Sequence, residues 1–393
     1  MKIQIPFFNL LIAATVLICS CEDSGSETHS KYIFPENERD WAIAEPEKYN
    51  FDSEKLEEIT KYVETTKLTC MMVIAGGEQI YKYGSNSTIS YIASCRKSVL
   101  AMLYGKYVEN GTVNLYTTVG QMIEEYGMKD DVQGLLESEK LATINDLITS
   151  RSGIYHPASN GGDTADKPER GTMQRGEYYL YNNWDFNFAG AVLERLVKGS
   201  YSGKEIYSIM QSDLAHPIGM CDWDLNQQKY GGTWKGASAI SYYPAYHIYL
   251  STRDMARIGY LMLRKGEWNG KQVISRKWVE KITTPYSTFD EVNPSGEGQF
   301  SYGYMWWIFD YEYYKTNPAY EGAYMARGSG GQYLLVMPKL DLVVAWKTST
   351  SGGKSTSPSQ FFKAVKLLLE AYTGDVNITG SDEDIEFDDE IDY

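Results

Sequence analysis

The chain has 393 residues, about two to three times the usual domain size, so it can bury a large core and divide into two lobes. Hydrophobic residues make up 43% and charged residues 23%, with only 12 prolines, which excludes a collagen-like or wholly disordered chain. The formal net charge of −15 repels phosphate, so nucleic acid is not an expected partner.

The N-terminus has the pattern of an export signal. Lys2 precedes an apolar run from Ile3 to Ile18, which is short for a membrane span and leads into a polar segment. An aliphatic residue three positions before Cys21, with Ser20 directly before it, resembles a bacterial lipobox. This resemblance implies that residues 1–20 are a lipoprotein signal peptide and that Cys21 carries the lipid. The alternative is an ordinary signal peptide with two incidental thiols.

Export as a lipoprotein predicts attachment to a membrane in the periplasm or at the outer membrane. Residues 21–45 are then expected to form a tether. At the other end, Ser381 to Tyr393 hold eight acidic residues and no base, so residues 376–393 are predicted to be a disordered acidic tail. The sequence does not indicate an oligomeric state.

Helices and strands are predicted near both ends of the remaining chain. The periodicity predicts, in order, a helix over Ser53–Lys67, a hairpin of strands Cys70–Ala75 and Gln79–Tyr83, a helix over Val99–Val108, strands Tyr333–Met337 and Leu342–Trp346, and a helix over Ser359–Tyr372. One α/β domain interrupted by a helical insertion fits this order. We expect the α/β part at about 46–115 and 295–375 and the insertion at about 116–294. Charged turns such as Met128–Asp131 are interpreted as solvated loops.

Metal and histidine chemistry have little support in the sequence. Cys70, Cys95 and Cys221, which remain after the expected processing, suit neither a disulfide framework nor a zinc site, and neither a metal nor an organic cofactor is expected. His156 is the only histidine near a motif. It has no acidic partner at a recognisable spacing, so it is expected to be structural or to line a cleft.

A serine and a lysine one helical turn apart give the first chemical motif. If Ala93–Lys97 opens a helix, Ser94 and Lys97 lie on one face, where the amine can take the hydroxyl proton. The S-x-x-K pattern recurs at Ser351–Lys354, but Gly352 and Gly353 leave those side chains without a common face. Ser94 is therefore the predicted nucleophile.

Tyr181-Asn182-Asn183 is the one Y-x-N element in the chain. Alone it would be interpreted as an Asn-rich surface turn. Together with S-x-x-K it predicts a tyrosine that relays the serine proton, either as a phenolate or through a hydrogen-bond chain. Asn183 is expected to hold the substrate or the lysine.

With these motifs the chain resembles the class C β-lactamase-related serine hydrolases, which include penicillin-binding D-alanyl-D-alanine peptidases. The resemblance covers about Asn50 to Tyr372 and includes Leu147–Gly153 and Leu250–Arg257. The run Tyr181–Asn187 is most similar to the esterase and 6-aminohexanoate-dimer hydrolase branch. The resemblance implies an α/β (α+β) fold of the β-lactamase/transpeptidase type, with an antiparallel sheet flanked by helices and a mainly helical domain. It also implies acylation of Ser94, with Lys97 as base and Tyr181 as second acid–base group.

The third motif of the family departs from its usual pattern. Counting back from Pro338 places Ala323-Tyr324-Met325 where β-lactamases carry Lys-Thr-Gly, so the lysine is missing. The glycine-rich segment that follows, which includes Ala326, Arg327, Gly328 and Ser329, resembles the family's non-lactamase members. Its backbone is expected to bind substrate, with the Ala326 N–H as a candidate oxyanion donor and Arg327 as a candidate cation for a substrate carboxylate.

The sequence thus predicts an exported serine hydrolase that acts on a small ester, amide or peptide. The alternatives are a penicillin-binding D,D-peptidase or β-lactamase, and a catalytically silent binding protein that uses the same cleft.

Overall fold

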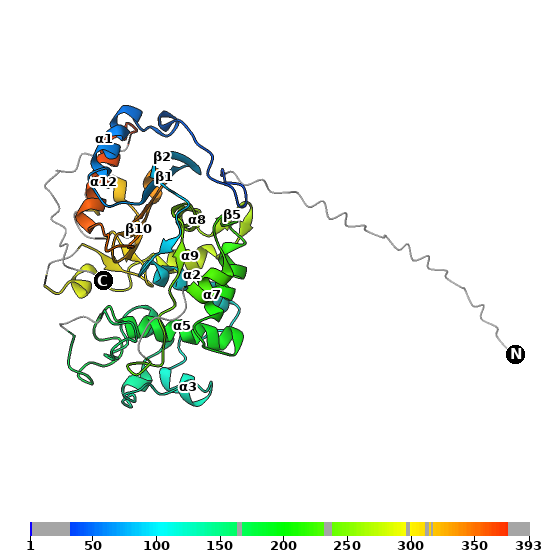
Figure 1. Cartoon of the computed structure of the whole chain (residues 1–393). Coiled ribbons are helices and arrows are strands. Elements are labelled where there is room, and N and C mark those ends of the chain that lie inside the picture. The colour runs from blue at the N-terminus through cyan, green and yellow to red at the C-terminus, as the bar shows by residue number, and fades with distance from the viewer. Residues whose placement is uncertain are drawn as a thin grey trace.

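A seven-stranded antiparallel sheet in the order β2-β1-β11-β10-β9-β8-β7 organises the computed structural model (Figure 1). The structure describes residues 1, 32–162, 167–231, 238–295, 299–310, 314–315 and 317–375. The sheet strands are β1 (Cys70–Ala75), β2 (Glu78–Gly84), β7 (Ser301–Tyr302), β8 (Trp307–Ile308), β9 (Tyr324–Gly328), β10 (Gln332–Met337) and β11 (Leu342–Lys347). Strand β1, early in the chain, and β11, late in the chain, are therefore neighbours in one sheet.

Helices cover both faces of this sheet. Every residue of β1, β10 and β11 is buried, as expected for strands covered on both sides. Helices α1 (Ser53–Val63) and α12 (Pro358–Glu370) pack together on one side, where Phe361 stacks on Tyr333 with ring centroids 4.5 Å apart. Helix α8 (Thr252–Leu263) lies against β1, β10 and β11. These contacts confirm the predicted α/β architecture.

The remaining helices form the mainly helical part in the lower half of Figure 1 and its junction with the sheet. They are α2 (Cys95–Glu109), α3 (Val119–Glu124), α4 (Ile144–Ile148), α5 (Asn183–Lys198), α6 (Glu205–Met210), α7 (Leu225–Gly231), α9 (Arg276–Ile282) and α10 (Phe289–Val292). Two further two-stranded sheets lie outside the main sheet: β3 (Ser90–Tyr91) pairs with the distant β4 (Tyr249–Leu250), and β5 (Glu267–Trp268) forms a hairpin with β6 (Lys271–Gln272).

The helical insertion is shorter than the sequence predicts. Residues of about 116–294 were expected to form a helical insertion, yet α8 within that range packs on β1, β10 and β11 of the sheet. Gly259 of α8 makes this approach possible, because a Cβ there would lie 2.6 Å from Val343 and 2.8 Å from Leu334 side-chain atoms. Strand β4 likewise returns to pair with β3 directly before the Ser94 motif.

Residues 32–45 also differ from expectation, because they pack on the domain rather than forming part of a tether. Trp41 is 4% exposed, and its indole N–H donates to the Arg253 carbonyl at 3.2 Å. Its ring meets Tyr260 edge-on at 5.6 Å, and Arg257 donates to the carbonyls of Glu36 and Arg39. The signal peptide, Cys21 and the acidic tail lie outside the described residues, among which no helix has the length and apolarity needed to cross a membrane.

Trp41 and Ile43 provide a test of this packing within a single short segment. We expect Trp41→Ala to lower the free energy of unfolding by about 3 to 5 kcal/mol, because it removes a large buried ring. Ile43 is 78% exposed, so Ile43→Ala should stay within about 0.5 kcal/mol of wild type. Urea unfolding followed by fluorescence measures both. Equal stability of both variants would show that the segment is a loose tether.

Candidate active site

Ser94 stands at a sharp turn between strand β3 and helix α2. Ala93 has φ +47°, a left-handed conformation that a residue with a Cβ seldom adopts. The turn is closed by backbone bonds from the N–H groups of Cys95, Arg96 and Lys97 to the carbonyls of Ile92, Ala93 and Ser94. Ser94 is half-buried at the N-cap of α2, so its hydroxyl faces the positive end of the helix dipole.

The structure brings Ser94, Lys97 and Tyr181 together. Lys97 Nζ lies 2.7 Å from Ser94 Oγ and 2.6 Å from Tyr181 Oη. Ser94 and Lys97 meet because they are one turn apart on α2. Tyr181 comes from the segment before α5, which carries it to α2 from 84 positions away. These distances allow direct proton transfer between Ser94 Oγ and Lys97 Nζ, and between Lys97 Nζ and Tyr181 Oη.

Lys97 is buried, and its pKa lies well below the usual lysine value. Loss of hydration is the main cause, since burial disfavours the charged ammonium form. The neighbouring guanidinium of Arg96 adds electrostatic repulsion. The neutral amine is therefore favoured, and this is the form that a base requires.

Arg96 is a contributor that the sequence did not single out. Its side chain is buried, donates to Asn187 Oδ1 at 3.3 Å and lies over the Tyr246 ring at 5.2 Å. Among the described residues no carboxylate pairs with it. Its charge therefore acts on Lys97 without neutralisation by an adjacent acid.

Tyr181 is positioned by aromatic rings and remains protonated at neutral pH. Trp307 of β8 stacks on its ring at 5.7 Å, and Phe186 of α5 lies at 4.9 Å. Burial raises the pKa of Tyr181 well above its ordinary value, although a hydrogen bond with Ser94 acts in the opposite direction. Of the two forms considered from the sequence, the structure favours the phenol over the phenolate.

Strand β9 passes directly beside the serine. A Cβ on Gly328 would lie 2.6 Å from the Ile92 carbonyl oxygen and 3.0 Å from the Ser94 nitrogen, so only glycine allows this approach. Gly328 thus occupies the position opposite Ser94, and the ungapped count that placed Ala323–Met325 there is off by three residues. The corrected position, Ala326-Arg327-Gly328, also lacks a lysine.

The pairing of β9 changes the expected oxyanion donor. Phe309 N–H donates to the Ala323 carbonyl, so residues 323, 325 and 327 point their main-chain groups toward β8. Ala326 and Gly328, which alternate with them, pair with Leu334 and Gln332 of β10. The Ala326 N–H is therefore directed into the sheet, whereas Ser329 follows β9 in the turn before β10 and lies outside the β9–β10 pairing.

Arg327 lies at the site's edge, in contact with its aromatic wall. The guanidinium carbon is 5.3 Å from the ring centroids of both Phe300 and Trp307. Because Trp307 also stacks on Tyr181, the charge of Arg327 is one ring away from Tyr181. This position is compatible with the expected contact to a substrate anion.

Asn183 and His156 have contacts elsewhere. The Asn183 amide donates to the carbonyls of Gly161 and Gly162 at 3.1 and 2.9 Å, which fixes that loop to the start of α5. His156 is buried, with Nε2 3.4 Å from Glu139 Oε2 and its ring 5.6 Å from Trp184. Burial would raise the pKa of Glu139, but hydrogen bonds from Arg170 and His156 lower it to about 2. These contacts favour a structural role for His156.

Lys347 at the end of β11 supports strand β3, which precedes the Ser94 turn, and its partner β4, a role that the sequence analysis did not identify. Its buried amine donates to the carbonyls of Ser90 at 2.9 Å and of Leu250, which joins the sheet to β3 and β4. Burial lowers the pKa of Lys347 to about 7. Its sequence signal, one lysine ending an apolar strand, does not reveal these partners. Among the described residues no cluster of three or more His, Cys or acidic side chains could hold a metal ion.

Comparisons with known proteins agree with this architecture. The family described as Beta-lactamase matches residues 60–364. A 105-residue stretch is 30% identical to an uncharacterised protein of Alkalihalophilus pseudofirmus, and the match spans only 29% of that relative.

Solved structures share the fold at low sequence identity. A Bacillus anthracis protein described as a 6-aminohexanoate-dimer hydrolase has a TM-score of 0.59 at 18% identity, covering 86% of this chain and 88% of that one. An octameric penicillin-binding protein homologue from Pyrococcus abyssi has a TM-score of 0.58 at 20% identity, covering 83% and 79%. The hydrolase EstCE1 has a TM-score of 0.57 at 12% identity, covering 82% and 98%. The family match extends over most of the chain and places Ser94, Lys97 and Tyr181 within its range, so this protein belongs to the Beta-lactamase family.

Proposed function

We propose that the protein is a serine hydrolase that cleaves an ester or amide through an acyl-enzyme on Ser94. One observation carries this proposal. The buried amine of Lys97, whose pKa is lowered so that the neutral form is favoured, lies 2.7 Å from Ser94 Oγ and 2.6 Å from Tyr181 Oη. A cleft that only binds a ligand does not require a buried lysine, because burial of its ammonium group without a carboxylate partner is energetically unfavourable. The alternative of a catalytically silent binding protein is therefore less well supported.

The proposed reaction begins when the Lys97 amine accepts the proton of Ser94 as Oγ attacks the substrate carbonyl. The N–H groups of Ser94 and Ser329 stabilise the negative charge that develops on the carbonyl oxygen. Proton transfer from Lys97, directly or through the Tyr181 phenol, then allows the alcohol or amine to leave. Water then attacks the carbonyl of the acyl-enzyme and gives a proton to Lys97. The bond to Ser94 Oγ breaks, Oγ regains a proton, and the acid is released.

The substrate class follows from the charges at the site. No lysine occupies the β9 position opposite Ser94, and Arg327 is the only cation within that strand. Small neutral esters are the favoured substrates, because they carry no carboxylate that the site must bind and they have a good leaving group. Resemblance to the Bacillus anthracis 6-aminohexanoate-dimer hydrolase keeps short amides among the candidates. A β-lactamase or D,D-peptidase would depend on Arg327 to bind the substrate carboxylate.

Hydrolysis of p-nitrophenyl esters, D-amino-acid amides and nitrocefin tests this assignment. Ser94→Ala should abolish turnover and fluorophosphonate labelling, and Lys97→Ala and Tyr181→Phe should each lower kcat/KM for esters by about a hundredfold or more. Ser351→Ala and Lys354→Ala, in the second S-x-x-K pattern, are the matched controls and should behave as wild type.

Three results would contradict the proposal in different ways. Labelling that persists in Ser94→Ala or is lost in Ser351→Ala would identify another nucleophile. A wild-type protein that is folded but neither labelled nor active would support the binding-protein alternative. Nitrocefin turnover on the order of 10⁵ M⁻¹s⁻¹ that is lost in Arg327→Ala would favour a β-lactamase.

The pH profile of kcat/KM reports the charge state of Lys97. Activity requires the neutral amine, so it should rise with pH through the pKa of Lys97. Arg96→Met removes the repulsion that helps to lower this pKa, so the acid limb should move to higher pH. Arg96→Lys, which retains the charge, should lie near wild type. Lys106→Met, at the exposed end of the same helix, is the control and should leave the profile unchanged. A limb that stays in place or moves to lower pH in Arg96→Met would contradict this role.

Export with a lipid anchor at Cys21 is a further part of the proposal, and it rests on the sequence pattern at Ile18–Cys21. Expressed in a bacterium, wild type should partition with membranes, because two acyl chains suffice for stable attachment. Cys21→Ser should be soluble or retained as a precursor, and Cys19→Ser is the matched control that should stay anchored. Identical partition of wild type and Cys21→Ser would remove the lipoprotein assignment.

A further inference from the structure

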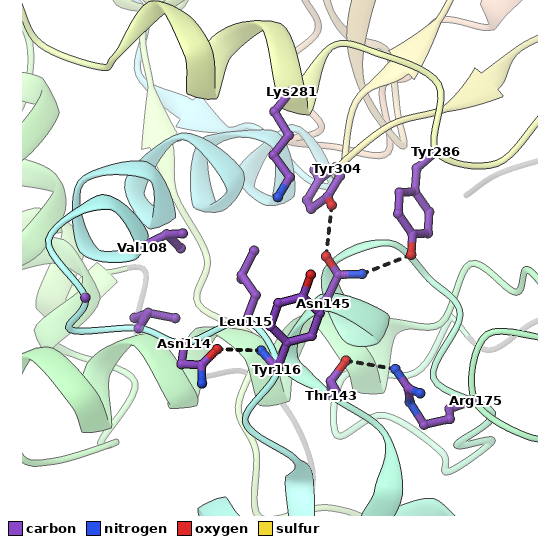
Figure 2. A pocket seen from close by; sticks show the side chains of 12 residues that line it. Val108, Asn114, Leu115, Tyr116, Thr143, Asn145, Arg175, Lys281, Tyr286 and Tyr304 are labelled. Atoms are coloured by element: carbon purple, nitrogen blue, oxygen red, sulfur yellow. Dashed lines mark hydrogen bonds between the residues drawn. The ribbon is translucent and has the colours of Figure 1, made fainter.

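A cavity of about 500 Å³ lies at the end of α2 far from the nucleophile (Figure 2). Val108 and Gly111 line it, and Val108 follows Ser94 by fourteen positions on the same helix. At 1.5 Å per residue the two are about 20 Å apart along the helix axis. Ser94, Lys97 and Tyr181 do not line this cavity, so it is separate from the candidate active site.

The wall of this cavity is cationic, although the chain as a whole is acidic. Arg175 and Lys281 line it, and none of its described lining residues is Asp or Glu, whereas the chain has a formal charge of −15. Arg175 is already paired, with Nε 2.6 Å from Asp146 Oδ2. Among the described residues no ion pair neutralises Lys281. The net charge presented to a ligand therefore comes from Lys281.

Lys281 reaches the cavity from α9 and is held above aromatic rings. Its amine lies 5.2 Å from the Tyr304 ring centroid and 5.5 Å from that of Trp278. Figure 2 shows the side chain pointing from α9 toward Leu115 and Tyr116 on the opposite wall. An ammonium group in this position can meet an anion placed between the two walls.

A chain of hydrogen bonds sets the direction of a second donor. Tyr304 Oη donates to Asn145 Oδ1 at 2.9 Å, and Asn145 Nδ2 donates to Tyr286 Oη at 3.1 Å (Figure 2). Because the Tyr286 oxygen accepts from the amide, its own proton is available to donate toward a ligand. Tyr116, which is 78% exposed, adds an aromatic face at the rim. Lys281 and Tyr286 thus offer hydrogen-bond donors beside a ring platform.

We propose that this cavity binds a carboxylated sugar, such as a uronic acid residue. The ammonium of Lys281 and the hydroxyl of Tyr286 suit the carboxylate, and the tyrosine faces suit the apolar face of a pyranose ring. The volume lies within the range of small-molecule sites and accommodates one or two sugar units. The site is independent of acyl transfer at Ser94.

Titration calorimetry of the purified full chain with D-glucuronate, D-glucose and acetate tests the proposal. Ser94→Ala is used as the background, so that any turnover cannot contribute heat. D-glucuronate should bind at least about tenfold more tightly than D-glucose, which lacks the anion, and than acetate, which lacks the ring. Lys281→Met and Tyr286→Phe should each weaken glucuronate binding. Lys277→Met, on the same helix but outside the cavity, is the matched control and should leave it unchanged.

Several outcomes would overturn the inference. They are an absence of binding up to about 10 mM glucuronate, which would exclude millimolar affinity, and equal binding of glucose or acetate. Equal loss in Lys277→Met and Lys281→Met would do the same, since it would point to surface charge alone. Ester hydrolysis by the Lys281→Met variant of the wild-type enzyme should be unchanged. This readout separates failure of the sugar site from failure of the proposed hydrolase.

Discussion

The burial of the Lys97 amine between Ser94 and Tyr181 is the constraint on which the site depends. An ammonium without a carboxylate partner is unfavourable away from water, so burial favours the neutral base. Placing an acid beside Lys97 would stabilise the ammonium and remove its basicity. Arg96 next to it, and aromatic rings around it, are the surroundings that preserve the neutral form.

The aromatic composition around the site follows from the same constraint. The neutral phenol of Tyr181 requires no charged partner, but its ring must be held in position. Trp307, Phe186 and Tyr302 hold the ring through aromatic contacts. Trp307 belongs to the sheet and Phe186 to α5, so the phenol is held by both parts of the fold at once. Movement of the helical part against the sheet would separate the Tyr181 ring from Trp307. Part of the chain's tyrosine and tryptophan content thus serves to hold this junction.

Local patterns predicted the elements whose signals lie within one segment. Strand β1 begins and ends where the buried apolar run and the Gly76-Gly77 turn place it, and the S-x-x-K spacing brings Ser94 and Lys97 within hydrogen-bond distance. Burial that depends on distant partners was not predictable. Asp131, read as part of a solvated turn, is buried because Trp184 and Ser241 donate to it. The packing of residues 32–45 depends in the same way on α8, more than 200 positions away.

Helix α2 connects the two sites mechanically. Gly105 lets the Trp278 ring approach the helix, where a Cβ would lie 2.4 Å from the indole, and Trp278 donates its indole N–H to the Ala101 carbonyl at 2.9 Å. Helix α9, which carries Lys281, is therefore fixed to the helix that begins at Ser94. A ligand at the cavity would therefore meet a wall that packs directly on the helix that begins at Ser94. The two sites thus share helix α2 but use different side chains, since Ser94, Lys97 and Tyr181 do not line the cavity.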